Sequence, residues 1–192
     1  MIRSARPLLP VLSTGLVLAL LGGCALQPTV EQGATDPPLA LEAFFPGVST
    51  GDGVFVNTWT GAERRFRVRI DGAWDGTTLT LAEDFDYDDG ERDRKTWRLR
   101  RLADGSFSGT REDVVGQARI WTEGRVVRLQ YKVKLAGWTL GFSDVLALRP
   151  DGTLINRATV GKWGIRLGRV ELVLRKQPGD AVTYPVSAPH PR

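Results

Sequence analysis

Short runs of alternating polar and apolar residues recur through the middle of this 192-residue sequence. Arg65–Ile70 alternates without a break, and so does the longer run from Val127 to Leu135. Alternation with a period of two places every second side chain on one face of a β-strand. The runs are separated by pairs of an acidic residue and glycine, which are typical of tight turns because glycine accepts positive φ angles: Asp71-Gly72, Asp75-Gly76, Asp104-Gly105, Glu123-Gly124 and Asp151-Gly152.

This central region shows no convincing helical period. The alternating runs number about eight to ten and recur roughly every 8–12 residues, as in a barrel or sandwich. Connections this short favour an antiparallel meander, in which each strand pairs with its neighbour in the sequence. A long meander tends to close, because closure removes the unpaired edge strands. The sequence therefore predicts an all-β fold, a single antiparallel meander β-barrel of about eight to ten strands.

The charges around Gly90 predict the register of one hairpin. If Asp88–Gly90 is a three-residue loop with Gly90 in the left-handed conformation, Asp86 lies opposite Arg92. A two-residue loop would instead set Asp86 against Asp93, and like charges directly opposite each other are unfavourable. Charge pairing therefore favours the three-residue loop.

The same register predicts which side chains of this hairpin point inward. It pairs Asp84 with Arg94 on the charged face, and on the other face it gives three pairs: Leu79 with Leu99, Leu81 with Trp97, and Glu83 with Lys95. Because the second face is the apolar one, Glu83 and Lys95 are expected to point into the barrel. An inward charge pair must be well hydrogen-bonded or exposed to a wet cavity.

A series of segments follows a recognisable order along the chain: Arg65-Phe66, Asp75-Gly76, Leu79–Gly90, Trp97, Asp113–Ala118, Asn156-Arg157, Lys162 and Gly164. This order resembles the domain-of-unknown-function 3833 family, and the Tyr87–Gly90 and Asp113–Gly116 segments are its most specific parts. The resemblance implies an exported protein of Gram-negative bacteria, commonly a lipoprotein, with a lipocalin- or calycin-like barrel. It implies no activity and no catalytic residue.

The N-terminal residues have the pattern of a lipoprotein signal peptide. Two arginines are followed by an apolar stretch, Pro7–Leu21, that is too short for a comfortable transmembrane span. The small residues before Cys24 predict cleavage between Gly23 and Cys24, with a diacylglycerol on the thiol and an amide-linked fatty acid such as palmitate. Cys24 is the only cysteine of the chain, so an internal disulfide is excluded. Ala25 after the cysteine favours the periplasmic face of the outer membrane.

Composition divides the remaining chain into three parts. Residues 24–40 are expected to be the lipidated cysteine and a flexible tether, residues 41–177 the barrel, and residues 178–192 a disordered, proline-rich tail. Removal of residues 1–23 takes away two arginines and no acid, so the formal net charge falls from +4 to +2. We therefore expect no nucleic-acid partner, and we expect a monomer held on a membrane by its lipid.

The sequence shows no catalytic constellation. The single histidine, His190, lies in the C-terminal tail, and Gly105–Gly109 has phenylalanine where a nucleophile elbow needs serine. No phosphate-binding loop or dinucleotide motif is present. Alternating aspartates around Asp86 could suggest calcium, but the loop lacks the EF-hand spacing and faces arginines. We predict no catalytic residue, no metal site and no cofactor.

Four residues are the candidates for a ligand site inside the barrel: Glu83, Lys95, Trp97 and Tyr131. Glu83 could also act as an acid or base, with Lys95 lowering its pKa. The tryptophans, at 59, 74, 97, 121, 138 and 163, are spaced as core residues and barrel-end plugs usually are. The favoured hypothesis is a tethered barrel that binds a lipid or another apolar small molecule. The alternatives are an envelope structural or assembly factor with a side-chain-filled barrel and, less favoured, an enzyme using an inward carboxylate.

Overall fold

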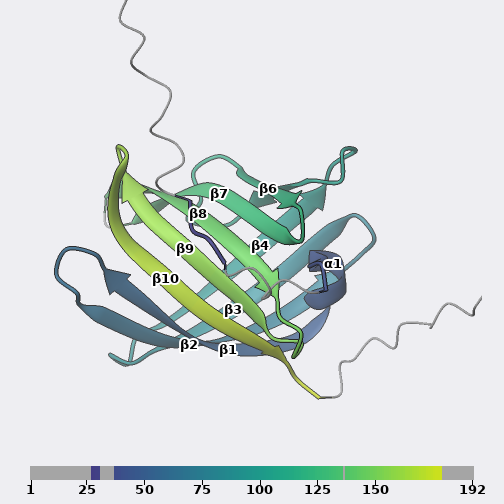
Figure 1. Ribbon diagram of the computed structural model, residues 1–192, viewed down its shortest axis with the longest axis horizontal. Helices are drawn as coiled ribbons and strands as arrows, with labels where there is room; N and C mark the ends of the chain where they lie inside the picture. Colours follow the sequence, from purple (N-terminus) through teal and green to yellow (C-terminus); the bar gives the residue numbers. More distant parts are fainter. Residues whose placement is uncertain (1–26, 31–36, 136, 179–192) are drawn as a thin grey trace, which may run out of the picture.

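A computed structural model describes residues 27–30, 37–135 and 137–178. Its described residues form a closed antiparallel barrel of ten strands with one short helix (Figure 1). The elements are α1 (Leu41–Phe44), β1 (Gly47–Asn57), β2 (Glu63–Trp74), β3 (Thr78–Tyr87), β4 (Arg92–Arg101), β5 (Phe107–Thr110), β6 (Ala118–Glu123), β7 (Val126–Leu135), β8 (Trp138–Leu148), β9 (Leu154–Lys162) and β10 (Ile165–Lys176). The all-β barrel predicted from the sequence is confirmed, with a strand number at the upper end of the expected range.

Every strand pairs with its neighbours in the sequence, and β1 pairs with β10 to close the sheet. Successive connections therefore alternate between the two ends of the barrel. One end, which we call the mouth, carries the connections at residues 58–62, 88–91, 111–117 and 163–164, together with the β7–β8 turn. The other, which we call the closed end, carries the connections at residues 75–77, 102–106, 124–125 and 149–153.

The short helix α1 covers the closed end. The buried side chains of Leu41, Phe44 and Phe45 belong to the core of the barrel. Glu42 of the helix accepts a hydrogen bond from Arg101 at the end of β4, with 2.7 Å between Oε1 and the guanidinium nitrogen. Burial of three large apolar side chains stabilises the closed end by several kcal/mol, on the order of 1.5–3 kcal/mol for each.

The β3–β4 hairpin has the register predicted from its charges. Leu79 pairs with Leu99, Leu81 with Trp97, Glu83 with Lys95, Asp84 with Arg94, and Asp86 with Arg92. The backbone N–H of Tyr87 donates to the carbonyl of Glu91 at 2.9 Å, which leaves a three-residue loop between them. Gly90 has a φ of 84°, the left-handed conformation that the loop requires.

The expected turn at Asp71-Gly72 is wrong, because both residues continue strand β2. A Cβ atom on Gly72 would collide with the backbone carbonyl of Phe45, where the chain leaves α1 for β1. Glycine is therefore needed here for close approach of two backbones and not for a turn.

The expected tether over residues 24–40 is too long at its C-terminal end. Leu39 is buried in the core, and its backbone N–H donates to the carbonyl of Arg125 at 3.1 Å. The predicted signal peptide, Cys24 and residues 179–192 lie outside the described residues. In the part of the chain that the structure describes, all strand pairs lie between residues 47 and 176, and these strands close the barrel. Among the described residues, no helix is long and apolar enough to cross a membrane.

Candidate ligand-binding cavity

A cavity of about 640 Å³ occupies the interior of the barrel. Leu41 and Phe45 line it at the closed end, while Asn57 and Leu135 line it at the mouth. Inward side chains of the strands form its wall, and most of them are apolar or aromatic, including Ile70, Leu129, Leu146, Val160 and Leu172. The cavity therefore runs along the axis of the barrel with α1 as its floor.

Two groups of aromatic rings stand in this wall. On β2 and β3, the ring of Phe66 lies edge-on to that of Phe85, with 5.7 Å between centroids, and Phe85 stacks on Tyr87. On β4, β7 and β8, Tyr131 lies edge-on to Trp97 and stacks on Phe142, each at 5.1 Å. These rings give the cavity rigid apolar surfaces that fit hydrocarbon or ring systems.

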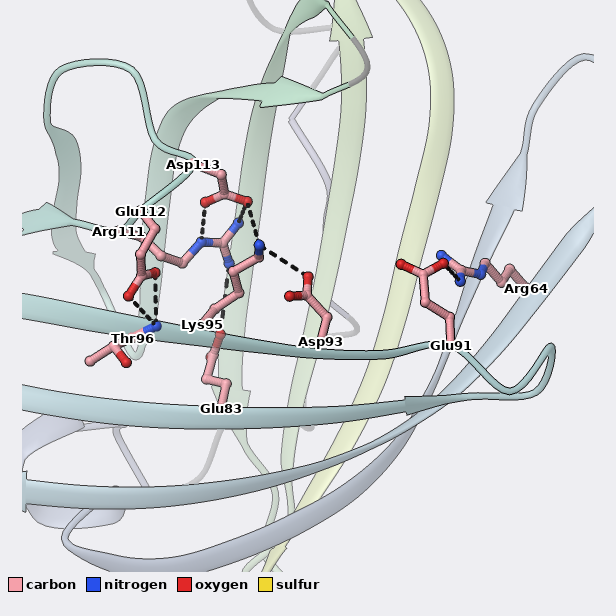
Figure 2. Close-up of polar contacts among 9 residues, drawn as sticks. All are labelled: Arg64, Glu83, Glu91, Asp93, Lys95, Thr96, Arg111, Glu112 and Asp113. Carbon is pink, nitrogen blue, oxygen red and sulfur yellow. Dashed lines mark hydrogen bonds and ion pairs between the residues drawn. The ribbon is translucent and has the colours of Figure 1, made fainter.

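The four residues predicted from the sequence all line the cavity: Glu83, Lys95, Trp97 and Tyr131. Glu83 and Lys95 are opposite each other in the register, but their charges have different partners (Figure 2). The Lys95 ammonium lies 3.0 Å from an Asp93 carboxylate oxygen and 4.0 Å from Asp113. The Glu83 carboxylate lies 3.7 Å from a guanidinium nitrogen of Arg111.

Arg111 comes from the irregular connection between β5 and β6 and reaches into the cavity (Figure 2). Its guanidinium donates two hydrogen bonds to Asp113, at 2.7 and 3.2 Å. It also lies 4.7 Å from the centre of the Trp97 ring and 5.7 Å from that of Tyr131. Arg111 thus joins the aromatic wall to the carboxylates, through cation–π contacts and a two-point ion pair.

A second polar group stands on β7, β8 and β9. The Tyr131 hydroxyl donates to Asp144 Oδ2 at 3.3 Å, and the Asn156 side-chain amide donates to the same oxygen at 3.4 Å. Asp144 is buried, with 5% of its surface exposed. A buried carboxylate needs such donors, because it has lost its hydration shell.

Burial raises the pKa of Glu83 from 4.5 to about 7, and the Arg111 charge opposes this shift. The sequence predicted that Lys95 lowers the pKa of Glu83, and this prediction is wrong. Desolvation has the larger effect on the Glu83 pKa, and the cation beside the carboxylate is Arg111. Burial likewise raises the pKa of Asp144 to about 7, against the hydrogen bonds from Asn156 and Tyr131. Both carboxyls can therefore gain or lose a proton near neutral pH.

Three oxygen atoms that face this space lack a hydrogen-bond partner: Glu83 Oε2, Asp144 Oδ1 and Asn156 Oδ1. All three are carboxylate or amide oxygens, which accept hydrogen bonds. A buried acceptor left without a donor costs on the order of 1–3 kcal/mol. The polar part of the cavity is therefore suited to a molecule that brings hydrogen-bond donors.

Sequence reasoning missed Arg111, Asp113, Asp144 and Asn156 as cavity residues. Asp144 could have been found, because Leu140, Phe142 and Leu146 alternate with it on the inward face of β8. Arg111 had no such signal, since its connection follows no period. The expectation of tryptophan plugs is wrong for positions 59, 138 and 163, which are exposed at the mouth.

Within the described ranges, no group of three or more histidine, cysteine, aspartate or glutamate side chains is arranged to hold a metal ion. The carboxylates of the cavity are instead paired with cations or accept hydrogen bonds from amide and hydroxyl groups, as described above.

A family model described as "Protein of unknown function (DUF3833)" matches residues 18–176. The comparison with curated proteins finds no match. Among solved structures, the chain is similar to a de novo designed fluorescence-activating β-barrel, with 12% sequence identity and a TM-score of 0.39. That alignment covers 72% of this chain and 99% of the designed one.

Proposed function

The chain belongs to the DUF3833 family of proteins of unknown function, and from its barrel we propose that it binds one amphipathic molecule of lipid type. The observation that carries this proposal is the cavity of about 640 Å³, with apolar and aromatic walls and a buried polar cluster. Ligand pockets commonly have volumes of about 300–1,000 Å³ and combine apolar walls with a few polar groups. A barrel filled by its own side chains would leave no such space, so the cavity argues against that alternative.

The polar cluster limits the chemistry of the ligand. The cations that line the cavity near Glu83 are paired already, Arg111 with Asp113 and Lys95 with Asp93. The atoms that lack a hydrogen-bond donor are acceptors, and the one on Glu83 has only the longer ion-pair contact of 3.7 Å with Arg111. A polar group that donates hydrogen bonds, such as a hydroxyl or an ammonium, therefore suits the site better than a carboxylate, which would meet Glu83 and Asp144 with like charge.

Membrane attachment through Cys24 belongs to the same proposal. It is supported by the sequence, in which small residues and a single cysteine follow a basic and then apolar N-terminus. A diacylglycerol with a further fatty chain would hold the barrel at the periplasmic face of the outer membrane, beside a source of amphipathic molecules. Replacement of Cys24 by serine should abolish the incorporation of radiolabelled palmitate into the protein. Palmitate that remains on this variant would contradict lipidation at Cys24.

The test of ligand binding uses residues 25–192, which contain the whole barrel. Three probes of equal chain length, 1-hexadecanol, hexadecylamine and hexadecanoic acid, are titrated at pH 8 and complexes are counted by native mass spectrometry. We expect one molecule of the alcohol or the amine to bind per barrel, and weaker binding of the acid. If none of the probes binds and no lipid co-purifies, the proposed function is wrong.

A cavity-filling variant separates interior binding from adhesion to the surface. Ala158 on β9 is buried and lines the cavity, so Ala158→Phe should occupy ligand space and reduce binding at least about tenfold. The matched control is Ala82→Phe on β3, whose neighbour Glu83 points inward, so that Ala82 faces outward. Equal loss of binding in both variants would contradict an interior site.

A second candidate function is proton-transfer catalysis on the bound molecule. It is favoured by the two buried carboxyls, Glu83 and Asp144, whose pKa values are raised to about 7 by burial. An acid–base role predicts that Glu83→Gln keeps ligand binding but abolishes turnover of the molecule that co-purifies. Release of that molecule unchanged from the wild-type protein would exclude this candidate.

A further inference from the structure

The exposed large apolar side chains gather at one end of the barrel. Among the described residues there are six, and all lie at the mouth: Trp59, Val115, Leu135, Trp138, Trp163 and Ile165. We call this set the apolar rim. Trp163 is 84% exposed and Trp59 71% exposed, so neither indole contributes to the core. Trp59 also donates its indole N–H to the Arg166 carbonyl at 3.0 Å, which holds the loop of β1 and β2 against β10.

The rim is contiguous along one side of the mouth. Leu135 pairs with Trp138 across the β7–β8 turn. The Lys162 ammonium lies 3.6 Å from the centre of the Trp138 ring and 4.3 Å from the Trp163 ring, and so links two hairpins. Val115 donates its backbone N–H to the Lys132 carbonyl on β7. These contacts place the rim over the neighbouring ends of β7 to β10, β1 and the β5–β6 connection.

Trp163 occupies its position at a cost. It has a φ of 52°, the only positive φ of a non-glycine residue in the described part of the chain, and Gly164 follows with 81°. Two positive φ angles define the tight hairpin turn in which asparagine and glycine are favoured. Neither a strained backbone nor a large apolar side chain in water stabilises the barrel. The position of Trp163 therefore indicates contact with another molecule.

The charge of the rim identifies that partner. Residues 131–143 and 156–170, which supply most of the rim, contain no acidic residue; their charged residues are Lys132, Lys134, Arg157, Lys162, Arg166 and Arg169. The acidic residues of the mouth lie outside these two segments: Asp88, Asp89 and Glu91 in the β3–β4 turn, Glu112 and Asp113 in the connection that carries Val115, and Glu63 at the start of β2. Asp113 is paired with Arg111 and Glu63 with Arg65, so these two carboxylates already have cations beside them. Tryptophan beside lysine and arginine is the composition that favours the interface of a bilayer with anionic head groups.

We propose that the apolar rim docks the mouth of the barrel onto an anionic lipid surface, with its indoles among the head groups. This contact needs neither a ligand in the cavity nor a lipid on Cys24. It would orient the barrel with its mouth facing the bilayer. A second copy of the chain suits the rim less well, because a symmetric contact would bring the same lysines and arginines together.

The test measures flotation of residues 25–192 with vesicles, a form that lacks the predicted lipid. Vesicles of phosphatidylglycerol and phosphatidylcholine are compared with vesicles of phosphatidylcholine alone. We expect binding to the anionic vesicles, with much weaker binding to the neutral ones and a loss of binding at high salt. Recovery of the wild-type protein only in the unbound fraction, with folding verified by circular dichroism, would overturn the proposal.

Trp163→Asn is the most informative variant. Asparagine tolerates the positive φ, so the melting temperature should stay the same or rise, while the partition into anionic vesicles should fall about tenfold. The matched control is Trp121→Asn on β6, an indole that is away from the mouth and lies over Arg119. Equal losses of vesicle binding in the two variants would contradict docking through the rim.

Charge is tested by a pair of double variants. Lys132→Gln with Lys134→Gln removes two exposed cations near the rim, of which Lys134 also lines the mouth of the cavity. The double variant should weaken binding to anionic vesicles about tenfold or more. Arg98→Gln with Arg100→Gln makes the same change on exposed positions of β4, near the closed end, and should change binding little. A dimer in solution that is abolished by Trp163→Asn, without any vesicle binding, would assign the rim to self-association instead.

Discussion

Glu83 and Lys95 lie directly opposite each other across the β3–β4 ladder, but each forms its ion pair with a different residue. Glu83 faces Arg111, which is supplied by the β5–β6 connection, and Lys95 binds Asp93 on its own strand. Arg111 is therefore the cation that compensates the buried carboxylate of Glu83. A segment without regular structure thus completes the charge balance of the cavity.

Replacement of Arg111 by methionine should destabilise the protein by about 3–5 kcal/mol at pH 8, because it leaves a buried carboxylate without its cation. At pH 5 the loss should be smaller, since Glu83 then carries a proton in the folded state. Urea denaturation at the two pH values measures both effects. Arg92→Met, which breaks the exposed pair with Asp86, should cost less than about 1 kcal/mol, and an equal loss in both variants would argue against a compensating role of Arg111.

The raised pKa values of Glu83 and Asp144 predict that stability falls as the pH rises from about 4 to about 7. Their ordinary values are 4.5 and 3.8, and both become about 7 in the folded protein. Between these limits the folded state holds protons that the unfolded state has released, so the free energy of unfolding decreases with pH. Each carboxyl contributes on the order of 3 kcal/mol to the decrease.

Thermal unfolding at pH 5 and pH 7.5 checks this dependence. The melting temperature of the wild-type protein should be higher at pH 5, and Glu83→Gln with Asp144→Asn should flatten the difference, since neither amide titrates. Asp84, half-buried on the outer face of the barrel, has a lowered pKa because of its hydrogen bond from Arg94, so its contribution to stability is lost only at lower pH. A double variant with an unchanged pH profile would show that other groups are responsible.

The β-barrel and the β3–β4 register could be predicted because both follow from the alternation of polar and apolar residues within short segments of the sequence. Asp84 and Arg94 are on neighbouring strands, so the charge pattern of one hairpin determines their pairing. The partner of Glu83 could not be predicted in this way, since Arg111 lies in a connection without a period and joins elements that are not adjacent in the sheet. Helix α1 is four residues long, which is too short to show a helical period.

Reversal of the charge of Asp84 tests the register in solution. The guanidinium of Arg94 donates to the two Asp84 oxygens at 2.5 and 2.8 Å, on a largely exposed surface. Asp84→Arg should therefore destabilise the protein by roughly 0.5–1 kcal/mol, and addition of Arg94→Asp should restore most of the loss. Chemical denaturation of the two single variants and the double variant gives the coupling energy. Losses that simply add would indicate that the two side chains do not pair.

Gly72→Ala tests whether close backbone contact holds α1 on the closed end. An added Cβ would overlap the carbonyl oxygen of Phe45 and lie 2.8 Å from its carbonyl carbon, so that α1 or β2 must move. We expect the free energy of unfolding, measured by chemical denaturation, to fall by about 1–3 kcal/mol, and we expect weaker retention of a ligand in the cavity whose floor is displaced.

Gly141→Ala on β8 is the matched control, because its Cβ would meet only the Gly161 oxygen, at 3.6 Å. That variant should be neutral or slightly stabilising, since alanine restricts the unfolded chain more than glycine does. Equal effects of the two substitutions would mean that loss of glycine alone, and not the approach of Phe45, accounts for the destabilisation.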